Sequence, residues 1–308
     1  MMASRAFQLA IIGGLLAGLL FGAMLTGSFG GMILFWMAPL PLFAVGFRLG
    51  LRMVAVAGLA GTVAVTIGEP SLGLVFAVMI ALPVLLMTGV ALASSRHRVA
   101  GALLLALTAL GVSYFAIACL LAVNQDGGLE GAVTATVKEA ADQATRQFPE
   151  LAGISGEWLD RIGLWLPGFS LALWLVIFAG NGILAQGLMV RIGGSLVPIL
   201  AIAEIDVPRI VGIGFIAAML AAAEGSGGLA FAGWSLAEIL AVPLLFGGLG
   251  VVHALLARNP MRAGLLTVFY AVVLGFGFPI PLIVALGLIE QWVELRRRFA
   301  AAPRQGEE

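Results

Sequence analysis

The sequence predicts an all-α polytopic membrane protein: a transmembrane helical bundle of about 8–10 membrane segments with one amphipathic extracytoplasmic insert. The first observation is composition, since 61% of the 308 residues are hydrophobic and only 10% are charged, whereas soluble domains carry about 25% charged residues. The second is a series of apolar runs, several near the length of about 20 residues that a span needs. The third is a single long polar interruption at residues 124–165.

These observations indicate one membrane-embedded domain, 1–308, in three stretches. An N-terminal helical block (1–123) precedes the acidic extracytoplasmic insert (124–165), and a C-terminal helical block (166–308) follows. The first apolar run follows Arg5 and is longer than the core of a secretory signal, so we interpret it as an uncleaved span. We place spans near the following residues: 6–27, 31–47, 53–68, 72–93, 99–123, 166–190, 208–224 and 233–257. The stretch Gly31–Gly68 leaves room for a re-entrant piece.

The last apolar stretch, 263–295, admits two interpretations. A straight helix over 263–290 would be about 42 Å long, too long for a hydrocarbon core of about 30 Å without strong tilt. Pro279 and Pro281 interrupt such a helix. The alternative is a short hairpin with arms near 263–278 and 280–295.

The distribution of bases favours the hairpin and orients the chain. With the hairpin and with Arg5 in the cytoplasm, 13 of the 16 bases fall on the cytoplasmic side, as the positive-inside rule requires. We therefore expect both termini to be cytoplasmic and the insert to lie outside. The 13 bases are Arg5, Arg48, Arg52, Arg96, Arg98, Arg191, Arg209, Arg258, Arg262, Arg296, Arg297, Arg298 and Arg304.

The insert carries seven acids against three bases. Its acids are Asp126, Glu130, Glu139, Asp142, Glu150, Glu157 and Asp160. Apolar residues at helical spacing over 129–148 predict an amphipathic helix that Pro149 ends. A second run, Leu151–Trp165, predicts an interfacial helix that leads into the next span. The insert is therefore either a lid or spacer without chemistry, or an external gate.

Small residues recur every four positions along the first span. They are Ala6, Ala10, Gly14, Gly18 and Gly22. Small residues at this spacing let a second helix approach closely in a membrane, where lipid provides no hydrophobic drive between helices. The face serves either packing within this chain or docking of another membrane protein.

Polar residues inside membrane segments are costly and often functional. Asn181 lies near the middle of the sixth span, and Glu69, Glu224 and Glu238 lie near predicted outer ends of spans. If the three acids converge, they form a vestibule that attracts a cation or an amine; otherwise each reaches water separately. Substrate contact and interhelical hydrogen bonding both remain open for Asn181. These four residues are the candidate substrate-binding residues.

The C-terminal tail ends in a basic cluster, Arg296, Arg297 and Arg298. Such a cluster binds anionic headgroups at about 1 kcal/mol per base. We interpret it as a membrane-surface anchor, with a handle for a cytoplasmic partner as the alternative.

The sequence argues against several functional classes of protein. Cys119 is the single cysteine and the two histidines are far apart, which excludes a disulfide framework and argues against a metal site. Neither a phosphate-binding loop nor a hydrolase motif is present. We therefore predict no catalytic residues, no cofactor and no enzyme activity. The balance of 16 bases and 16 acids suggests no nucleic-acid partner.

The C-terminal half carries specific motifs in three parts. The first is Asn181-Gly-Ile-Leu-Ala-Gln-Gly-Leu-Met-Val-Arg191 followed by Glu204-Ile-Asp-Val-Pro208-Arg, and the second is Val252-His253-Ala-Leu-Leu-Ala with Phe269-Tyr270. The third and most specific is Gly287-Leu-Ile-Glu290-Gln-Trp292-Val-Glu-Leu-Arg296-Arg. Together they resemble the YybS-like family of uncharacterised bacterial multi-pass inner-membrane proteins, which is distantly similar to the S components of energy-coupling-factor transporters. Many relatives carry Asp where this sequence has Glu290.

The resemblance implies a bacterial inner (cytoplasmic) membrane protein with a transporter-like fold. It implies a small-solute binding protein, similar to an S component, that has no ATPase of its own. The series from Ala6 to Gly22 is similar to the face on which S components dock a coupling subunit. The alternative is a membrane scaffold or assembly factor with no transported solute. The expected partners are the lipid bilayer, a membrane protein at the first helix and a small solute.

Overall fold

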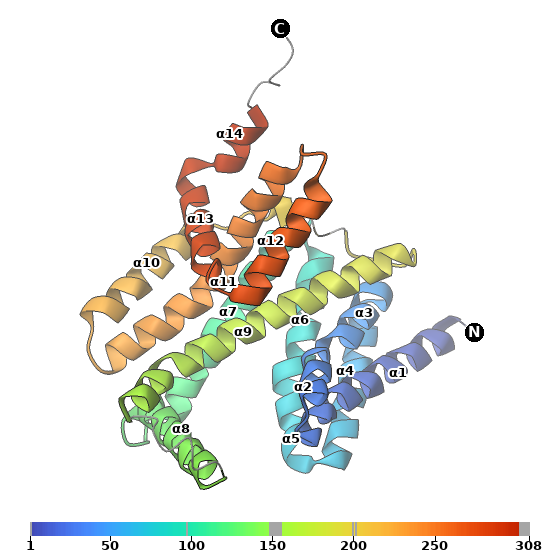
Figure 1. The fold of residues 1–308 in the computed structure, drawn as a ribbon. Coiled ribbons are helices and arrows are strands. Elements are labelled where there is room, and N and C mark those ends of the chain that lie inside the picture. The colour runs from blue at the N-terminus through green and yellow to red at the C-terminus, as the bar shows by residue number, and fades with distance from the viewer. Residues whose placement is uncertain (1, 97, 148–155, 199, 201, 302–308) are drawn as a thin grey trace. The chain divides into compact units, whose positions relative to one another are not determined.

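A computed structural model describes residues 2–96, 98–147, 156–198, 200 and 202–301. Within this part of the chain every regular element is a helix, which confirms the all-α prediction (Figure 1). In chain order the helices are α1 (Met2–Gly22), η1 (Ala23–Thr26), α2 (Phe29–Trp36), α3 (Pro39–Leu49), α4 (Leu51–Gly68), α5 (Pro70–Phe76), η2 (Ala77–Ala81), α6 (Leu82–Ala93), α7 (Val99–Leu121), α8 (Gly128–Gln147), α9 (Gly156–Arg191), η4 (Ile202–Glu204), α10 (Arg209–Glu224), α11 (Gly228–Leu256), α12 (Arg262–Phe276), α13 (Ile280–Val293) and α14 (Leu295–Ala301).

Seven helices among the described residues are long and apolar enough to cross a bilayer, or up to eight if the bent pair α12–α13 is one span. The predicted span at 208–224 is a helix, α10, but it has only 16 residues. At 1.5 Å per residue it reaches about 24 Å, less than a hydrocarbon core of about 30 Å. The number of spans is therefore at or just below the lower end of the predicted range.

The last apolar stretch forms a hairpin rather than one straight helix. Its two arms, α12 and α13, are bent by 120° relative to each other. Gly277 ends the first arm with φ +70°, a left-handed conformation that glycine adopts without steric penalty. Pro279 and Pro281 stand at the beginning of the second arm, where a missing N–H is tolerated.

The insert contains the predicted amphipathic helix as α8, and none of its described side chains is buried. The predicted interfacial helix is not separate. From Gly156 onward it is the first part of α9, which runs without a break through Pro167 to Arg191. The parts of these predictions that concern Pro149, Leu151, Ile154 and Arg304 lie outside the described residues.

The chain divides into two compact units that do not follow the three predicted stretches. Unit 1 comprises Met1–Leu107 and Val176–Glu204, and unit 2 comprises Thr108–Leu175 and Ile205–Glu308. Both α7 and α9 therefore contribute one part to each unit. The acidic insert belongs to unit 2.

In unit 1, α1 packs against α3 and α4, and α4 packs in turn against α5 and α6. Phe21 contacts the rings of Phe35 and Phe76. The inner part of the small-residue series faces α4. A Cβ at Gly14 would fall on the carbonyl oxygen of Ala57, and a Cβ at Gly18 would lie 3.2 Å from that of Gly61.

The remaining members of the small-residue series differ in burial. Ala10 is fully buried, Ala6 is half-buried, and a Cβ at Gly22 would meet open space. The middle of the predicted face is therefore occupied by α4 of the same chain, so the internal-packing interpretation describes its contacts. The apolar side chains on other faces of α1 are exposed: Phe7, Leu9, Ile12, Leu15, Leu16 and Leu19.

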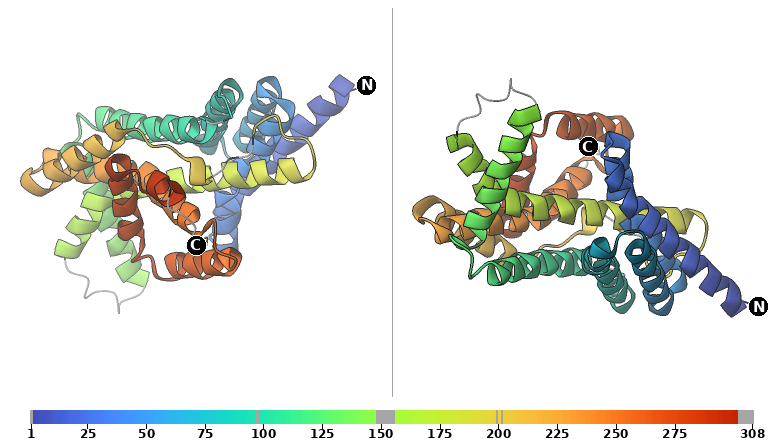
Figure 2. Two further views of the ribbon diagram at one scale, coloured as in Figure 1. Left: turned by 90° about the horizontal axis from the view of Figure 1, so that it is seen from above. Right: turned by 90° about the horizontal axis from the view of Figure 1, so that it is seen from below.

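In unit 2, α11 is the central helix and packs against α10 on one side and α13 on another (Figure 2). Glycines allow α11 and α13 to cross in backbone contact. A Cβ at Gly248 would fall on the carbonyl oxygen of Ile283, and one at Gly287 would fall on that of Leu244. This crossing holds the second arm of the hairpin against the core of unit 2.

Candidate functional site

The most unusual polar group in unit 2 lies where α9 and α11 cross. Glu238 projects from α11 toward Gly168 of α9, so closely that a Cβ at Gly168 would collide with Glu238 Oε2. A backbone hydrogen bond joins Phe169 to the Glu238 carboxyl group. Oε2 itself is buried and has no hydrogen-bond partner among the described residues.

A second polar atom lies one turn earlier on α11. Ser235 is fully buried, and its Oγ also lacks a partner in the described part of the chain. The backbone of Ser235 also lies against Gly168, since a Cβ at Gly168 would come within 2.9 Å of the Ser235 carbonyl oxygen. Only glycine therefore permits this approach of the two helices.

Two tryptophans lie one turn away from that crossing. Trp165 precedes Gly168 by three residues on α9, and Trp234 precedes Glu238 by four residues on α11. Their ring centroids are 6.2 Å apart with an interplanar angle of 53°. Trp165 is 43% exposed, so the pair lies at the edge of the unit.

This arrangement is energetically unfavourable for a purely structural role. A polar group removed from water without a compensating hydrogen bond costs about 1–3 kcal/mol, and a charged one costs more. A carboxyl group on a membrane helix is therefore a functional-site hypothesis, with a cation or a hydrogen-bond donor as its natural partner.

The other two predicted acids have different surroundings. Glu224 ends α10 and is exposed. Glu69 is also exposed, lies between α4 and α5 in unit 1, and accepts a hydrogen bond from Ser71 Oγ at 2.9 Å. Of the three acids, only Glu238 has a buried oxygen against a neighbouring helix.

Asn181 is buried in unit 1 and bridges two helices. Its Nδ2 donates to the carbonyl oxygen of Trp36, at the end of α2, over 2.9 Å. The same nitrogen donates to Ile177 on its own helix over 2.8 Å. Both amide hydrogens are thus directed to backbone carbonyl groups.

The chain around the end of α2 explains why Trp36 needs this donor. Pro39 and Pro41 have no N–H, and the N–H of Leu40 donates to Met37. None of the three can serve the carbonyl of Trp36, which a regular helix would pair with residue 40. Asn181 therefore replaces the hydrogen bond that is lost where α2 breaks from α3.

We expect Asn181→Leu to destabilise the protein by about 1 kcal/mol, because it leaves the Trp36 carbonyl unpaired inside a span. The measurement is the unfolding transition in a mild detergent titrated with SDS. Ser113→Ala is the control, since Ser113 is a mid-span residue whose hydroxyl bonds within its own helix to Ala109. Equal effects of the two substitutions would contradict this role for Asn181.

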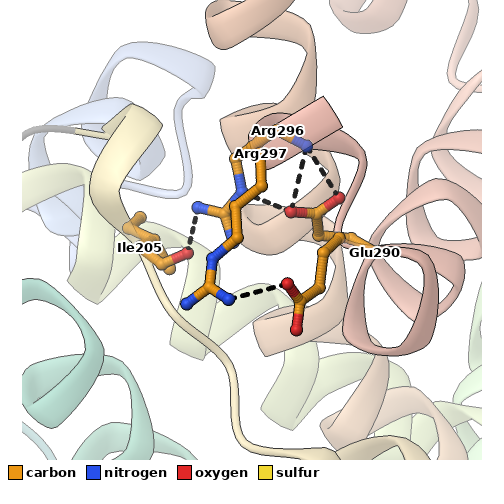
Figure 3. Close-up of polar contacts among 5 residues, drawn as sticks. Ile205, Glu290, Arg296 and Arg297 are labelled. Atoms are coloured by element: carbon orange, nitrogen blue, oxygen red, sulfur yellow. Dashed lines mark hydrogen bonds and ion pairs between the residues drawn. The ribbon is translucent and has the colours of Figure 1, made fainter. Parts of the chain in front are cut away.

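The three arginines of the predicted basic anchor have different surroundings. Arg296 donates from Nε to Glu290 Oε1 over 2.7 Å and from a terminal nitrogen to the carbonyl of Ile205 over 2.7 Å (Figure 3). Arg297 pairs with Glu294 over 2.8 Å and has a side chain that is 83% exposed. Arg298 is exposed. Arg296 thus holds the tail to unit 2, while Arg297 and Arg298 remain available to a membrane surface.

A second arginine makes the complementary contact. Arg209, at the start of α10, donates from Nε to the carbonyl oxygen of Gln291 over 3.0 Å. Arg296 of the tail therefore binds the segment before α10, and Arg209 of α10 binds the end of α13. Helical spacing could not reveal the pair of Arg296 with Glu290, because the two residues are six positions apart and helical partners lie three or four apart. They meet because Glu294, at φ +51°, turns the chain back.

The sequence interpretation missed the contributions of Ser235, Gly168 and the pairing of Trp165 with Trp234. Serine and glycine are common in this chain, and the tryptophans fit an aromatic belt near span ends. One signal was available for the tryptophans. Trp234 and Glu238 are four residues apart and therefore share one face of a helix.

Comparison with known proteins gives one match. A family model described as "Predicted membrane protein (DUF2232)" matches residues 15–290. Neither the curated proteins nor the solved structures include a match to this chain.

Proposed function

The chain belongs to the DUF2232 family of predicted membrane proteins, and we propose that it is a transporter-like protein that binds a small solute and has no ATPase of its own. It acts in the inner membrane of a bacterium, with both termini in the cytoplasm. The sequence resemblance to the YybS-like proteins, and through them to S components, supports this proposal. The solute site is at Glu238 in unit 2.

One observation carries the proposal. Five buried side-chain polar atoms in the described residues lack a hydrogen-bond partner, and Glu238 Oε2 is the one that belongs to an ionisable group. Ser235 Oγ, another of the five, is one turn away on the same helix. A membrane protein keeps such groups where a solute or an ion supplies the missing interaction.

The scaffold alternative would use the small-residue face of the first helix together with the basic tail. The resemblance to S components implies docking on the same face, so the cover of its centre by α4 limits a docking role in both proposals. Asn181, another of the four candidate substrate-binding residues, directs its amide nitrogen to two carbonyl groups. The substrate contacts we propose are therefore those of Glu238 and Ser235.

The test is solute-dependent stabilisation of the purified protein. A panel of inorganic cations, amines, amino acids and neutral polar solutes is screened for a rise in melting temperature, because a ligand that binds only the folded state stabilises it. We expect Glu238→Gln to weaken binding of the active solutes at least about tenfold, since it removes the charge but keeps the shape.

The matched controls are Glu224→Gln and Glu69→Gln, which neutralise the two exposed carboxylates. Binding should be unchanged in both. If no solute in the panel stabilises the wild-type protein in a way that depends on Glu238, the proposed function is wrong and the scaffold alternative gains ground.

A further inference from the structure

We propose that the solute bound at Glu238 is an organic ammonium cation, whose charged nitrogen faces the carboxylate and whose alkyl groups lie on Trp165 and Trp234. This inference rests on the proposed function and narrows it from a small solute to one chemical class. It depends on two neighbouring levels of the α9–α11 crossing, an aromatic one and a polar one.

The first level is the aromatic pair. At the second level, Gly168 of α9 lies against both Ser235 and Glu238 Oε2, and a backbone hydrogen bond joins Phe169 to the Glu238 carboxyl group. Trp234 and Glu238 are separated by one turn on α11, and Trp165 and Gly168 by one turn on α9. On each helix the indole and the residue at the polar level therefore lie on one face. The exposed edge of Trp165 is the accessible end of this series.

These two kinds of group have complementary chemistry for one type of ligand. Indole faces carry negative quadrupole charge and attract cations, tryptophan most strongly among the aromatic residues. A carboxylate one turn away neutralises the net charge of the same ligand. An inorganic cation needs the carboxylate and oxygen ligands but not the indoles, whereas an alkylated ammonium needs both.

The insert adds a further observation. A Cβ at Gly163 of α9 would lie 2.6 Å from Thr134 Oγ1, so α8 packs on α9 two residues before Trp165. α8 also contacts α11. The helix α8, with three acids against two bases, is thus attached beside the aromatic pair. Its excess of negative charge favours cations over anions there.

The experiment is calorimetric titration of the full-length protein in lipid nanodiscs. The probes are choline, tetramethylammonium and 3,3-dimethylbutan-1-ol, a neutral isostere of choline. We expect the two cations to bind with saturation and the neutral isostere to bind at least about tenfold more weakly. Glu238→Gln should abolish cation binding.

The aromatic part of the site is tested by Trp165→Leu and Trp234→Leu, each expected to weaken choline binding about tenfold. Trp158→Leu is the control, since Trp158 is an exposed tryptophan on the same helix. Trp165→Phe and Trp234→Phe keep a ring in place and should give intermediate affinities. If a leucine variant does not purify as folded protein, the phenylalanine variants test the aromatic contribution to choline binding instead.

Four results would overturn the inference, and the last of them would overturn the proposed function as well. Choline binding that is unchanged in both pairs of tryptophan variants would remove the aromatic contribution, and equal binding of the neutral isostere would remove the need for charge. Binding of another solute that needs Glu238 but neither tryptophan would also overturn it, yet would leave the proposed function standing. Absence of any Glu238-dependent binding would overturn both proposals.

Discussion

Replacing Arg296 by alanine is expected to lower the free energy of unfolding by about 3–5 kcal/mol, as removing one partner of a buried ion pair does. The Arg296 and Glu290 side chains are only 20% and 8% exposed. The substitution strands the Glu290 carboxylate and also unpairs the Ile205 carbonyl. The backbone N–H of Arg296, 3.3 Å from Glu290 Oε2, is too weak a donor to compensate.

The measurement is the unfolding transition in detergent, followed by proteolysis of the C-terminal tail. Arg297→Ala is the control, because Arg297 is exposed and such ion pairs contribute less than about 1 kcal/mol. The double replacement Glu290→Leu with Arg296→Met should recover much of the loss, since no unpaired charge is left. If Arg296→Ala and Arg297→Ala unfold alike, Arg296 is a surface residue and the pair is not structural.

The second large effect is expected for Gly14→Leu in α1. The Cβ alone would fall on the Ala57 carbonyl oxygen, and no side-chain rotation relieves a clash with backbone. α1 would have to move away from α4 and lose its buried contacts. We expect destabilisation at or above the upper end of the about 1–3 kcal/mol typical of overpacked cores.

Gly22→Leu is the matched control because it belongs to the same four-residue series but faces open space. It should leave the stability of the purified protein nearly unchanged. The pair also separates the two interpretations of the series. If Gly22→Leu keeps the fold but loses a co-purifying membrane protein, the exposed end of the series docks a partner. Equal stability of the two variants would show that α1 does not pack as described.

Much of the fold is predictable because membrane insertion leaves few alternatives. Apolar runs in lipid must satisfy their backbone groups internally and therefore form helices. The break in the last apolar stretch followed from Pro279 and Pro281, whose effect on a helix is local, and the distribution of bases favoured the hairpin. The bounds of α10 were also predicted to within one residue, at 208–224 against Arg209–Glu224, but its 16 residues are fewer than a full span needs.

The candidate site was predictable only in part. Glu238 was identifiable because a carboxylate on a membrane helix is rare and costly. The sequence could not separate it from Glu69 and Glu224, which have the same side chain and a similar place in the pattern. What distinguishes Glu238 is the contact with Gly168, a residue 70 positions earlier in the chain.

The sequence by itself determined that this is a helical membrane protein, where most helices lie along the chain, and which residues carry the expensive polar groups. These properties depend on composition and on contacts within a few residues. The tertiary structure alone decided what the polar groups do: Asn181 repairs the break before Pro39, Arg296 closes the tail on Glu290, and Glu238 Oε2 has no hydrogen-bond partner among the described residues. The physical reason is that each role depends on which distant backbone or side-chain atom lies within hydrogen-bond distance, and residue spacing along one helix carries no such information.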